Sequence, residues 1–83
     1  MPLFMAVHQI AGGAAMDDVA QAHLADLQAQ AAHNVRYLRY WADEGNGQVF
    51  CLVEAPSAEA AADVHWEAHG LMADHIYRVQ EGS

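Results

Sequence analysis

The sequence contains very little cysteine and very little positive charge. One cysteine, Cys51, stands among 83 residues, so no disulfide can form within the chain. Three arginines and no lysine face eleven acidic residues, which gives a net charge of −8. Binding to nucleic acid or to an anionic membrane requires clustered cations. The charge balance therefore argues against both classes of partner.

Long apolar runs are also missing from the sequence. No stretch approaches the roughly 20 apolar residues that a membrane-spanning helix needs. Residues 1–5 carry none of the basic side chains that precede the apolar core of a signal peptide, so we expect no secretory signal. A lone cysteine is typical of proteins in a reducing compartment, and we expect a cytoplasmic protein.

The apolar residues that are present can build only a thin core. They make up 54 % of the chain, and 18 of them are alanine. A domain of this size buries only about 60 % of its unfolded surface, and we expect residues 1–83 to form a single domain. Such small domains usually need a disulfide, a metal or a second subunit for stability. Because a disulfide is excluded, a metal ion or a partner subunit remains.

The order of apolar runs and turn residues predicts strand, helix, strand, strand, helix, strand. We expect strands at residues 3–8, 35–41, 48–54 and 76–79, and helices at 17–32 and 58–69. Gly45-Asn46-Gly47 is typical of a hairpin turn. Ser57 and Gly70 suit the start and the left-handed end of the second helix. This order predicts an α+β, ferredoxin-like βαββαβ sandwich, in which two helices cover one face of a four-stranded antiparallel sheet.

The third predicted strand is apolar on both of its faces. Phe50 and Leu52 alternate with Val49, Cys51 and Val53. A sheet that is apolar on both faces is normally covered on both, but the two helices cover only one. We therefore expect a homodimer.

Six histidines in a chain this short are about three times the ordinary usage. His65 and His69 lie four residues apart, which places both rings on one face of the second predicted helix. His23 lies on the apolar stripe of the first helix, where a polar ring needs a partner. The two helices lie side by side in this fold, so we expect His23 to approach the pair. His69 has an alternative role near the helix end, where a partly charged ring complements the helix dipole.

Oxygen donors accompany these rings. Asp26 follows His23 by three residues, His8 ends the first predicted strand and Glu54 ends the third. The first and third strands are neighbours in a ferredoxin-like sheet, so we expect these side chains to converge. Imidazole and carboxylate together suit nickel, zinc, copper or iron, and spacing alone does not select among them. The candidate metal ligands are His8, His23, Asp26, Glu54, His65 and His69.

Other chemistry-bearing residues are expected to have structural roles. Cys51 lies in the middle of a strand, where a buried structural thiol is the common outcome. His33 and His75 are expected at the surface. Glu67 follows His65 by two residues rather than one, so it points away from the histidine face and no zinc-protease motif is present.

Three segments resemble the small nickel-binding, nickel-responsive ferredoxin-like proteins of bacteria, a family long filed as a domain of unknown function. They are residues 35–41 (VRYLRYW), 49–56 (VFCLVEAP) and 64–71 (VHWEAHGL). Residues 7–8 and 22–27 extend the resemblance over nearly the whole chain.

This resemblance implies a ferredoxin-like homodimer that binds nickel through histidine and other polar ligands, in binding or sensing rather than catalysis. It implies that His8, His23, His65 and His69 are ligands, accompanied by Asp26 and Glu54. Two positions depart from the family pattern. Ala6 stands where an acidic residue is familiar, which would remove an oxygen ligand, and Trp66 stands where a charged residue is expected.

Two other functions stay open from the sequence. One is a small dimeric enzyme of the oxygenase or isomerase type, in which His23, Tyr40 and His65 act as acid–base groups or hold a redox metal. No nucleophile–base pattern accompanies it, and the fold alone does not imply a function. The other is a structural or regulatory dimer whose histidines lie in the core and at the surface.

Overall fold

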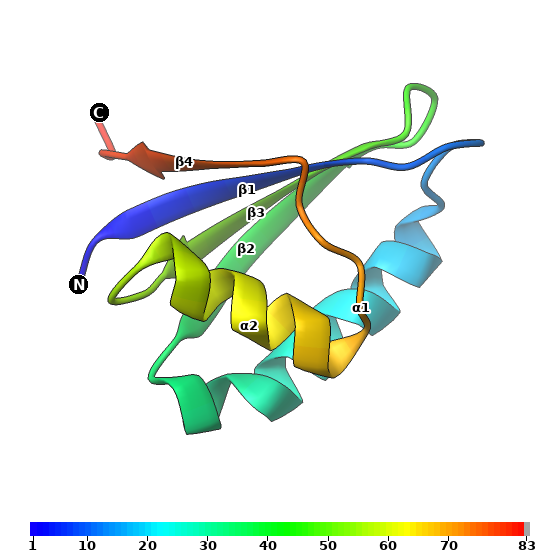
Figure 1. Ribbon diagram of the computed structural model, residues 1–83. Helices are drawn as coiled ribbons and strands as arrows, with labels where there is room; N and C mark the ends of the chain where they lie inside the picture. The colour runs from blue at the N-terminus through cyan, green and yellow to red at the C-terminus, as the bar shows by residue number, and fades with distance from the viewer. Residues whose placement is uncertain (83) are drawn as a thin grey trace.

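The computed structural model describes residues 1–82 and confirms the predicted α+β ferredoxin-like architecture. Four strands form one antiparallel sheet in the order β2-β3-β1-β4. Both helices pack on the same face of this sheet (Figure 1). Within residues 1–82, no helix combines the length and the apolarity needed to cross a bilayer. The elements are β1 (Leu3–Gln9), α1 (Met16–Ala29), the short 3₁₀ helix η1 (Gln30–His33), β2 (Arg36–Asp43), β3 (Gln48–Glu54), α2 (Ala58–Ala68) and β4 (His75–Val79).

The first helix ends earlier than the sequence predicted. Its α-helical part stops at Ala29, and the chain continues as η1. Asn34 then adopts a left-handed conformation with φ of 56°, and its N–H donates to the carbonyl of Ala31. Asparagine tolerates this conformation better than most residues, so the helix tightens into a 3₁₀ turn before the chain enters β2.

The second helix has the two ends that its sequence predicted. The Ser57 hydroxyl accepts a hydrogen bond from the N–H of Ala60 at 3.1 Å, which satisfies one of the free donors of the first turn. At the other end Gly70 has φ of 74°, and its N–H donates to the carbonyl of His65 at 2.8 Å. This sharp stop fixes His69 at the end of α2, beside the space between the two helices.

The core between sheet and helices is built from small residues. Ala6 and Val53 on the sheet and Ala61 and Val64 on α2 are fully buried. The Tyr37 hydroxyl donates to the carbonyl of Ala61 at 2.8 Å, which ties β2 to α2. Because alanine and valine fill little volume, the helices lie close to the sheet and polar side chains share the interior with apolar ones.

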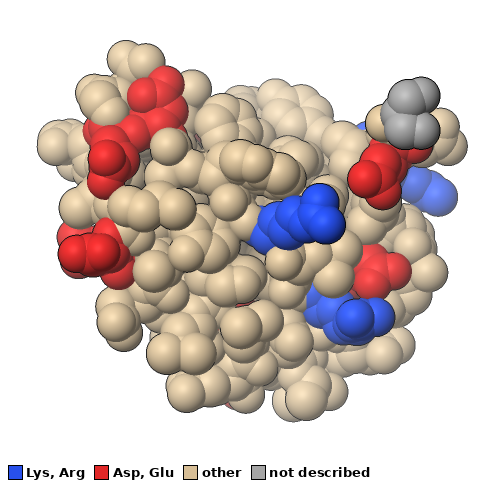
Figure 2. Space-filling view, turned by 180° about the vertical axis from the view of Figure 1, so that it is seen from behind, with Lys and Arg blue, Asp and Glu red and all other residues tan. Residues whose placement is uncertain are grey.

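The outer face of the sheet carries apolar side chains with no helix over them. Met5 and Val7 on β1 and Phe50 and Leu52 on β3 are only partly buried, and Trp41 on β2 is 48 % exposed. Figure 2 views the molecule from behind, where uncharged side chains cover most of the visible surface and acidic ones stand in separate groups near its margins. The expectation that both faces of the sheet are apolar therefore agrees with the structure.

The β2–β3 hairpin packs closely against the segment that follows β1. The N–H of Ile10 donates to the carbonyl of Gly47 at 2.6 Å. Gly47 has φ of 69°, and a Cβ atom at this position would lie 2.3 Å from the carbonyl oxygen of Ile10. Gly45, two residues earlier in the same turn, has open space around it.

We expect Gly47→Ala to lower the free energy of unfolding by about 1–3 kcal/mol, because the new methyl group is strained by the positive φ and collides with Ile10. Gly45→Ala is the matched control and should change stability by less than about 0.5 kcal/mol. Urea unfolding of both variants measures the difference. Equal losses in the two variants would contradict this account of the turn.

Candidate metal centre

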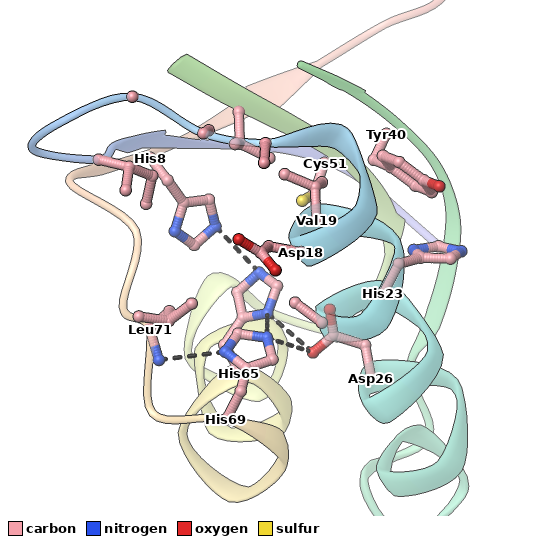
Figure 3. Close-up of a pocket in the computed structure, with 16 residues that line it drawn as sticks. His8, Asp18, Val19, His23, Asp26, Tyr40, Cys51, His65, His69 and Leu71 are labelled. Atoms are coloured by element: carbon pink, nitrogen blue, oxygen red, sulfur yellow. Dashed lines mark hydrogen bonds and ion pairs between the residues drawn. The ribbon is translucent and has the colours of Figure 1, made fainter. Parts of the chain in front are cut away.

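Polar side chains from three elements meet in the interior between the helices and the sheet. His8 comes from the end of β1, Asp26 from α1 and His65 from α2, and these residues are 4 %, 1 % and 1 % exposed. His69 follows the end of α2 and closes the group (Figure 3). All four line a cavity of about 120 Å³. The predicted convergence of α1 and α2 thus brings Asp26, His65 and His69 together.

Asp26, His65 and His69 present three donor atoms to one point. Asp26 Oδ1 lies 2.9 Å from His65 Nδ1 and 3.0 Å from His69 Nε2, and the two nitrogens are 3.2 Å apart. Ligand bonds of about 2.0–2.1 Å at right angles place neighbouring donors roughly 3 Å apart. The triangle of donors therefore has the size of one face of an octahedral metal site, and its composition is that of a 2-His-1-carboxylate triad.

His65 also faces a second group of donors. Its Nε2 atom lies 3.3 Å from His8 Nε2. The sulfur of Cys51, on the neighbouring strand β3, completes a group with His8 and His65 whose ligand atoms all lie within 4.8 Å of one another. Cys51 is 6 % exposed, so its expected burial agrees with the structure.

One arrangement of protons gives the Asp26 carboxylate two hydrogen bonds in the metal-free cluster, and the 3.2 Å contact between His65 and His69 is then a contact of two donors rather than a hydrogen bond. Each neutral imidazole has one N–H donor and one acceptor, and the tautomer is assigned from the neighbours. The backbone N–H of Leu71 donates to His69 Nδ1 at 3.1 Å, which leaves the ring proton on Nε2, facing Asp26. His65 then donates from Nδ1 to Asp26 and accepts at Nε2 from His8. The carboxylate of Asp26 is thereby held by two imidazole donors.

Burial disfavours the charged form of two imidazoles of this cluster, His8 and His69. Desolvation, with smaller contributions from positive charge on His65 and His69, lowers the pKa of His8 to about 4. The pKa of His69 is lowered as well, chiefly by burial and against the opposing effect of Asp26. Desolvation also raises the pKa of the Cys51 thiol to about 12. Neutral imidazoles are the form that binds metal ions.

His23 lines the same cavity but does not contact the cluster. Its ring packs against Tyr40, with 4.6 Å between ring centroids, and Figure 3 shows it turned away from His65 and His69. Its Nδ1 atom is buried and has no hydrogen-bond partner within residues 1–82. Burial lowers the pKa of His23 too. The ring of His23 thus packs on Tyr40 of β2, whereas the sequence led us to expect it beside His65 and His69.

Glu54 lies far from the cluster, so the expectation that it converges with His8 is wrong. β1 and β3 are antiparallel, and Glu54 is opposite Leu3 whereas His8 is opposite Val49. The last residues of two antiparallel neighbours lie at opposite ends of the sheet. Glu54 instead forms an ion pair with Arg36 at 3.4 Å.

The remaining histidines lie outside the cluster. His33 pairs with Glu67, whose side chain points away from the interior as its spacing predicted. His75 is exposed and stacks on Tyr77. Sequence reasoning did not foresee the packing of His23 on Tyr40 or the proximity of Cys51 to His8. The first depends on how α1 packs on β2 and the second on the register of β1 and β3, and the sequence pattern specifies neither.

Comparison with known proteins places these residues in a family. A model of the family "Nickel responsive protein SCO4226-like" matches residues 4–79. The chain belongs to this family. It is similar to the crystal structure of SCO4226 from Streptomyces coelicolor A3(2), with 42 % identity, a TM-score of 0.88, and coverage of 98 % of this chain and 99 % of that one. No match is found among curated proteins.

The lowered pKa of His8 gives this SCO4226-like protein a defined pH dependence in its metal-free form. Between pH 6.5 and about 4 the unfolded chain binds a proton at His8 that the folded chain does not bind. Stability is therefore fully present above pH 6.5 and falls as the pH is lowered toward 4. His69 and His23 act in the same direction, since their pKa values are also lowered.

We expect the thermal midpoint of chelator-treated protein to fall steeply from pH 6.5 to 4 and more gently in His8→Asn. His75→Asn, at an exposed position, is the control and should keep the slope of the unaltered protein. Circular-dichroism melts across this range measure the slopes. A slope in His8→Asn equal to that of the unaltered protein would contradict the assignment.

Proposed function

We propose that this protein binds a divalent transition-metal ion, nickel first among the candidates, at Asp26, His65 and His69, and that it acts as a homodimeric metal buffer or sensor. The observation that carries this proposal is the triangle of buried donors with edges of 2.9, 3.0 and 3.2 Å. Membership in a nickel-responsive family supports nickel over zinc or copper, which bind similar ligands.

The electrostatics of the cluster favour a cation. Asp26 is 1 % exposed, and burial disfavours the charged form of its partner His69. A buried negative charge is costly unless a cation compensates it. The overall charge of −8 also lowers the energy of a divalent ion near the protein.

Metal binding at this triangle requires the protons of the cluster to move. His65 Nδ1 and His69 Nε2 would give up the protons that they direct toward Asp26, and each ring would carry its proton on the other nitrogen. For His69 that nitrogen is Nδ1, which the N–H of Leu71 faces at 3.1 Å. Two donors cannot share this contact, so the Leu71 amide must turn away when the site fills. Such a movement of the segment after α2 would carry metal binding to the surface, and it supports the proposal of a sensor.

We expect untagged, chelator-treated protein to bind Ni²⁺ more tightly than about 1 mM at neutral pH, as measured by isothermal titration calorimetry. Asp26→Asn and His65→Gln should each weaken binding at least about tenfold, since even indirect metal partners are worth 10–100-fold. Binding should also weaken below about pH 6, where protons compete for the imidazoles.

His75→Gln and Glu54→Gln are the matched controls for nickel binding, because both residues lie outside the cluster. Each should retain the affinity of the unaltered protein. Near-ultraviolet circular dichroism of the Asp26 and His65 variants separates loss of a ligand from loss of the fold. The proposal fails if a control weakens nickel binding as much as Asp26→Asn does.

The homodimer is proposed on the outer face of the sheet. A hollow of about 460 Å³ on this face is lined by the apolar Met1, Leu3, Leu38 and Leu52 and by the charged Arg39, Glu54 and Glu81. A twofold interface pairs one surface patch with its own copy, so a patch that carries both an arginine and a glutamate is complementary to itself. A second copy of this chain is therefore the occupant that fits the face best.

We expect the unaltered protein to sediment as a dimer and Leu52→Asp to sediment as a monomer, because the new carboxylate would be buried in the apolar interface. Leu24→Asp, at a position that is 50 % exposed on α1, is the control and should stay dimeric. Analytical ultracentrifugation distinguishes the two states. Dimerisation that survives Leu52→Asp would place the interface elsewhere.

A second candidate function is a small dimeric oxygenase. The triad beside a cavity favours it, because a 2-His-1-carboxylate set with open positions is typical of iron(II) oxygenases. The pair of His23 and Tyr40 lies on the wall of this cavity. Oxygen uptake by iron-loaded protein that disappears in His65→Ala would favour catalysis over passive binding.

A further inference from the structure

We propose that His65 bridges two metal ions, one at the Asp26–His65–His69 triangle and a second at a sulfur-containing site formed by His8, Cys51 and His65. The first ion rests on the proposed function. The second site has two ligands, His8 and Cys51, that the first does not share, so a separate measurement tests it.

The orientation of the His65 ring is the first support for a bridge. Its Nδ1 atom faces Asp26 and His69, and its Nε2 atom faces His8. The two nitrogens of an imidazole point away from each other, so the ring stands between two separate groups of donors. Packing fixes it there, because His65 is 1 % exposed and its ring lies 4.6 Å from that of Tyr37 and 4.8 Å from that of His8, centroid to centroid.

The donor distances of the second group suit a tetrahedral ion. His8 Nε2 and His65 Nε2 are 3.3 Å apart, and bonds of about 2.0–2.1 Å at the tetrahedral angle place two nitrogens roughly 3.3 Å apart. The sulfur of Cys51 and one ring nitrogen from each of His8 and His65 lie within 4.8 Å of one another, and in Figure 3 the sulfur points toward the cavity. A small approach of this side chain would complete three ligands.

The chemistry of this group differs from that of the triangle. Two imidazoles and a thiolate suit zinc, copper(I) or nickel, whereas the triangle has only nitrogen and oxygen donors. The adjoining cavity of about 120 Å³ leaves room for a water molecule as a fourth ligand. Three protein ligands with one open position are the arrangement of a reactive rather than a purely structural metal site.

Filling both sites releases protons and transfers no electrons. The S–H bond of Cys51 breaks as the sulfur–metal bond forms, and that proton passes to the buffer. When both His65 nitrogens bind metal, the ring also loses its N–H proton. The carboxylate, the thiolate and the imidazolate then offset most of the charge of two divalent ions, as burial requires.

A shared imidazolate couples the two sites. Occupation of one site leaves the His65 proton on the nitrogen that faces the other site and places a positive charge nearby, so the affinity of each site depends on whether the other is filled, and the dependence is reciprocal. A plot of bound metal against free metal concentration would therefore deviate from the curve expected for independent sites.

The experiment titrates untagged, chelator-treated protein anaerobically with Co²⁺, a spectroscopic probe for both kinds of site. We expect two ions per chain and a thiolate-to-metal charge-transfer band, which Cys51 alone can produce because it is the one cysteine of the chain. Calorimetry in buffers of different ionisation enthalpy should report proton release with the second ion.

Two variants separate the sites. Cys51→Ser should bind one ion, lose the band and release fewer protons, and Cys51→Ala repeats the test if the serine variant does not fold. Asp26→Asn should bind one ion and keep the band. This inference is overturned if the unaltered protein binds one ion without a charge-transfer band and Asp26→Asn binds none. That result would still agree with the proposed function. A band at a stoichiometry of one overturns the bridge.

Discussion

The interior of this protein depends on the contacts of the buried Asp26 carboxylate with His65 and His69. This carboxylate accepts hydrogen bonds from His65 and His69 and so ties α1 to α2 across the middle of the helical layer. His65 and Asp26 are among the largest fully buried side chains, beside Val53 and Val64. The centre of the domain is therefore polar where most small domains are apolar. A buried charge of this kind is tolerated only while its partners stay in place.

The small residues around this cluster make the arrangement possible. Ala6, Ala55 and Ala61 are fully buried and leave space that larger apolar side chains would fill. The imidazoles and the carboxylate occupy that space, and a cavity remains beside them. The thin alanine core and the large number of histidines thus belong to one feature, an interior that holds imidazoles and a carboxylate in place of packed hydrocarbon. The outer face of the sheet leaves apolar surface exposed that the small core does not bury. A second copy of the chain would bury this surface.

The order of helices and strands was predictable because each element is marked by its own cap residues, turn residues or apolar periodicity. Ser57 and Gly70 mark the ends of α2, and the alternation of residues 48–54 marks β3. The end of α1 was not predictable, since the left-handed turn at Asn34 competes with good helix-forming residues and prevails only in the folded chain. The candidate site was likewise predictable only in part. His65 and His69 followed from their spacing on a single helix, and Asp26 from the position of its helix beside theirs.

The positions of Glu54 and His23 were not predictable from the local sequence pattern. Each residue was expected near the cluster because its element neighbours the others, but strand direction places Glu54 at the opposite end of the sheet from His8, and the ring of His23 packs on Tyr40. By itself, the sequence determined the fold class, the hairpin and the helix ends, because these depend on contacts between residues close in the chain. The tertiary structure alone decided which of six histidines meet, and that Cys51 lies beside two of them. Apart from the His65–His69 pair, those contacts join residues dozens of positions apart, and they form only when the strands have paired and the helices have packed on the sheet.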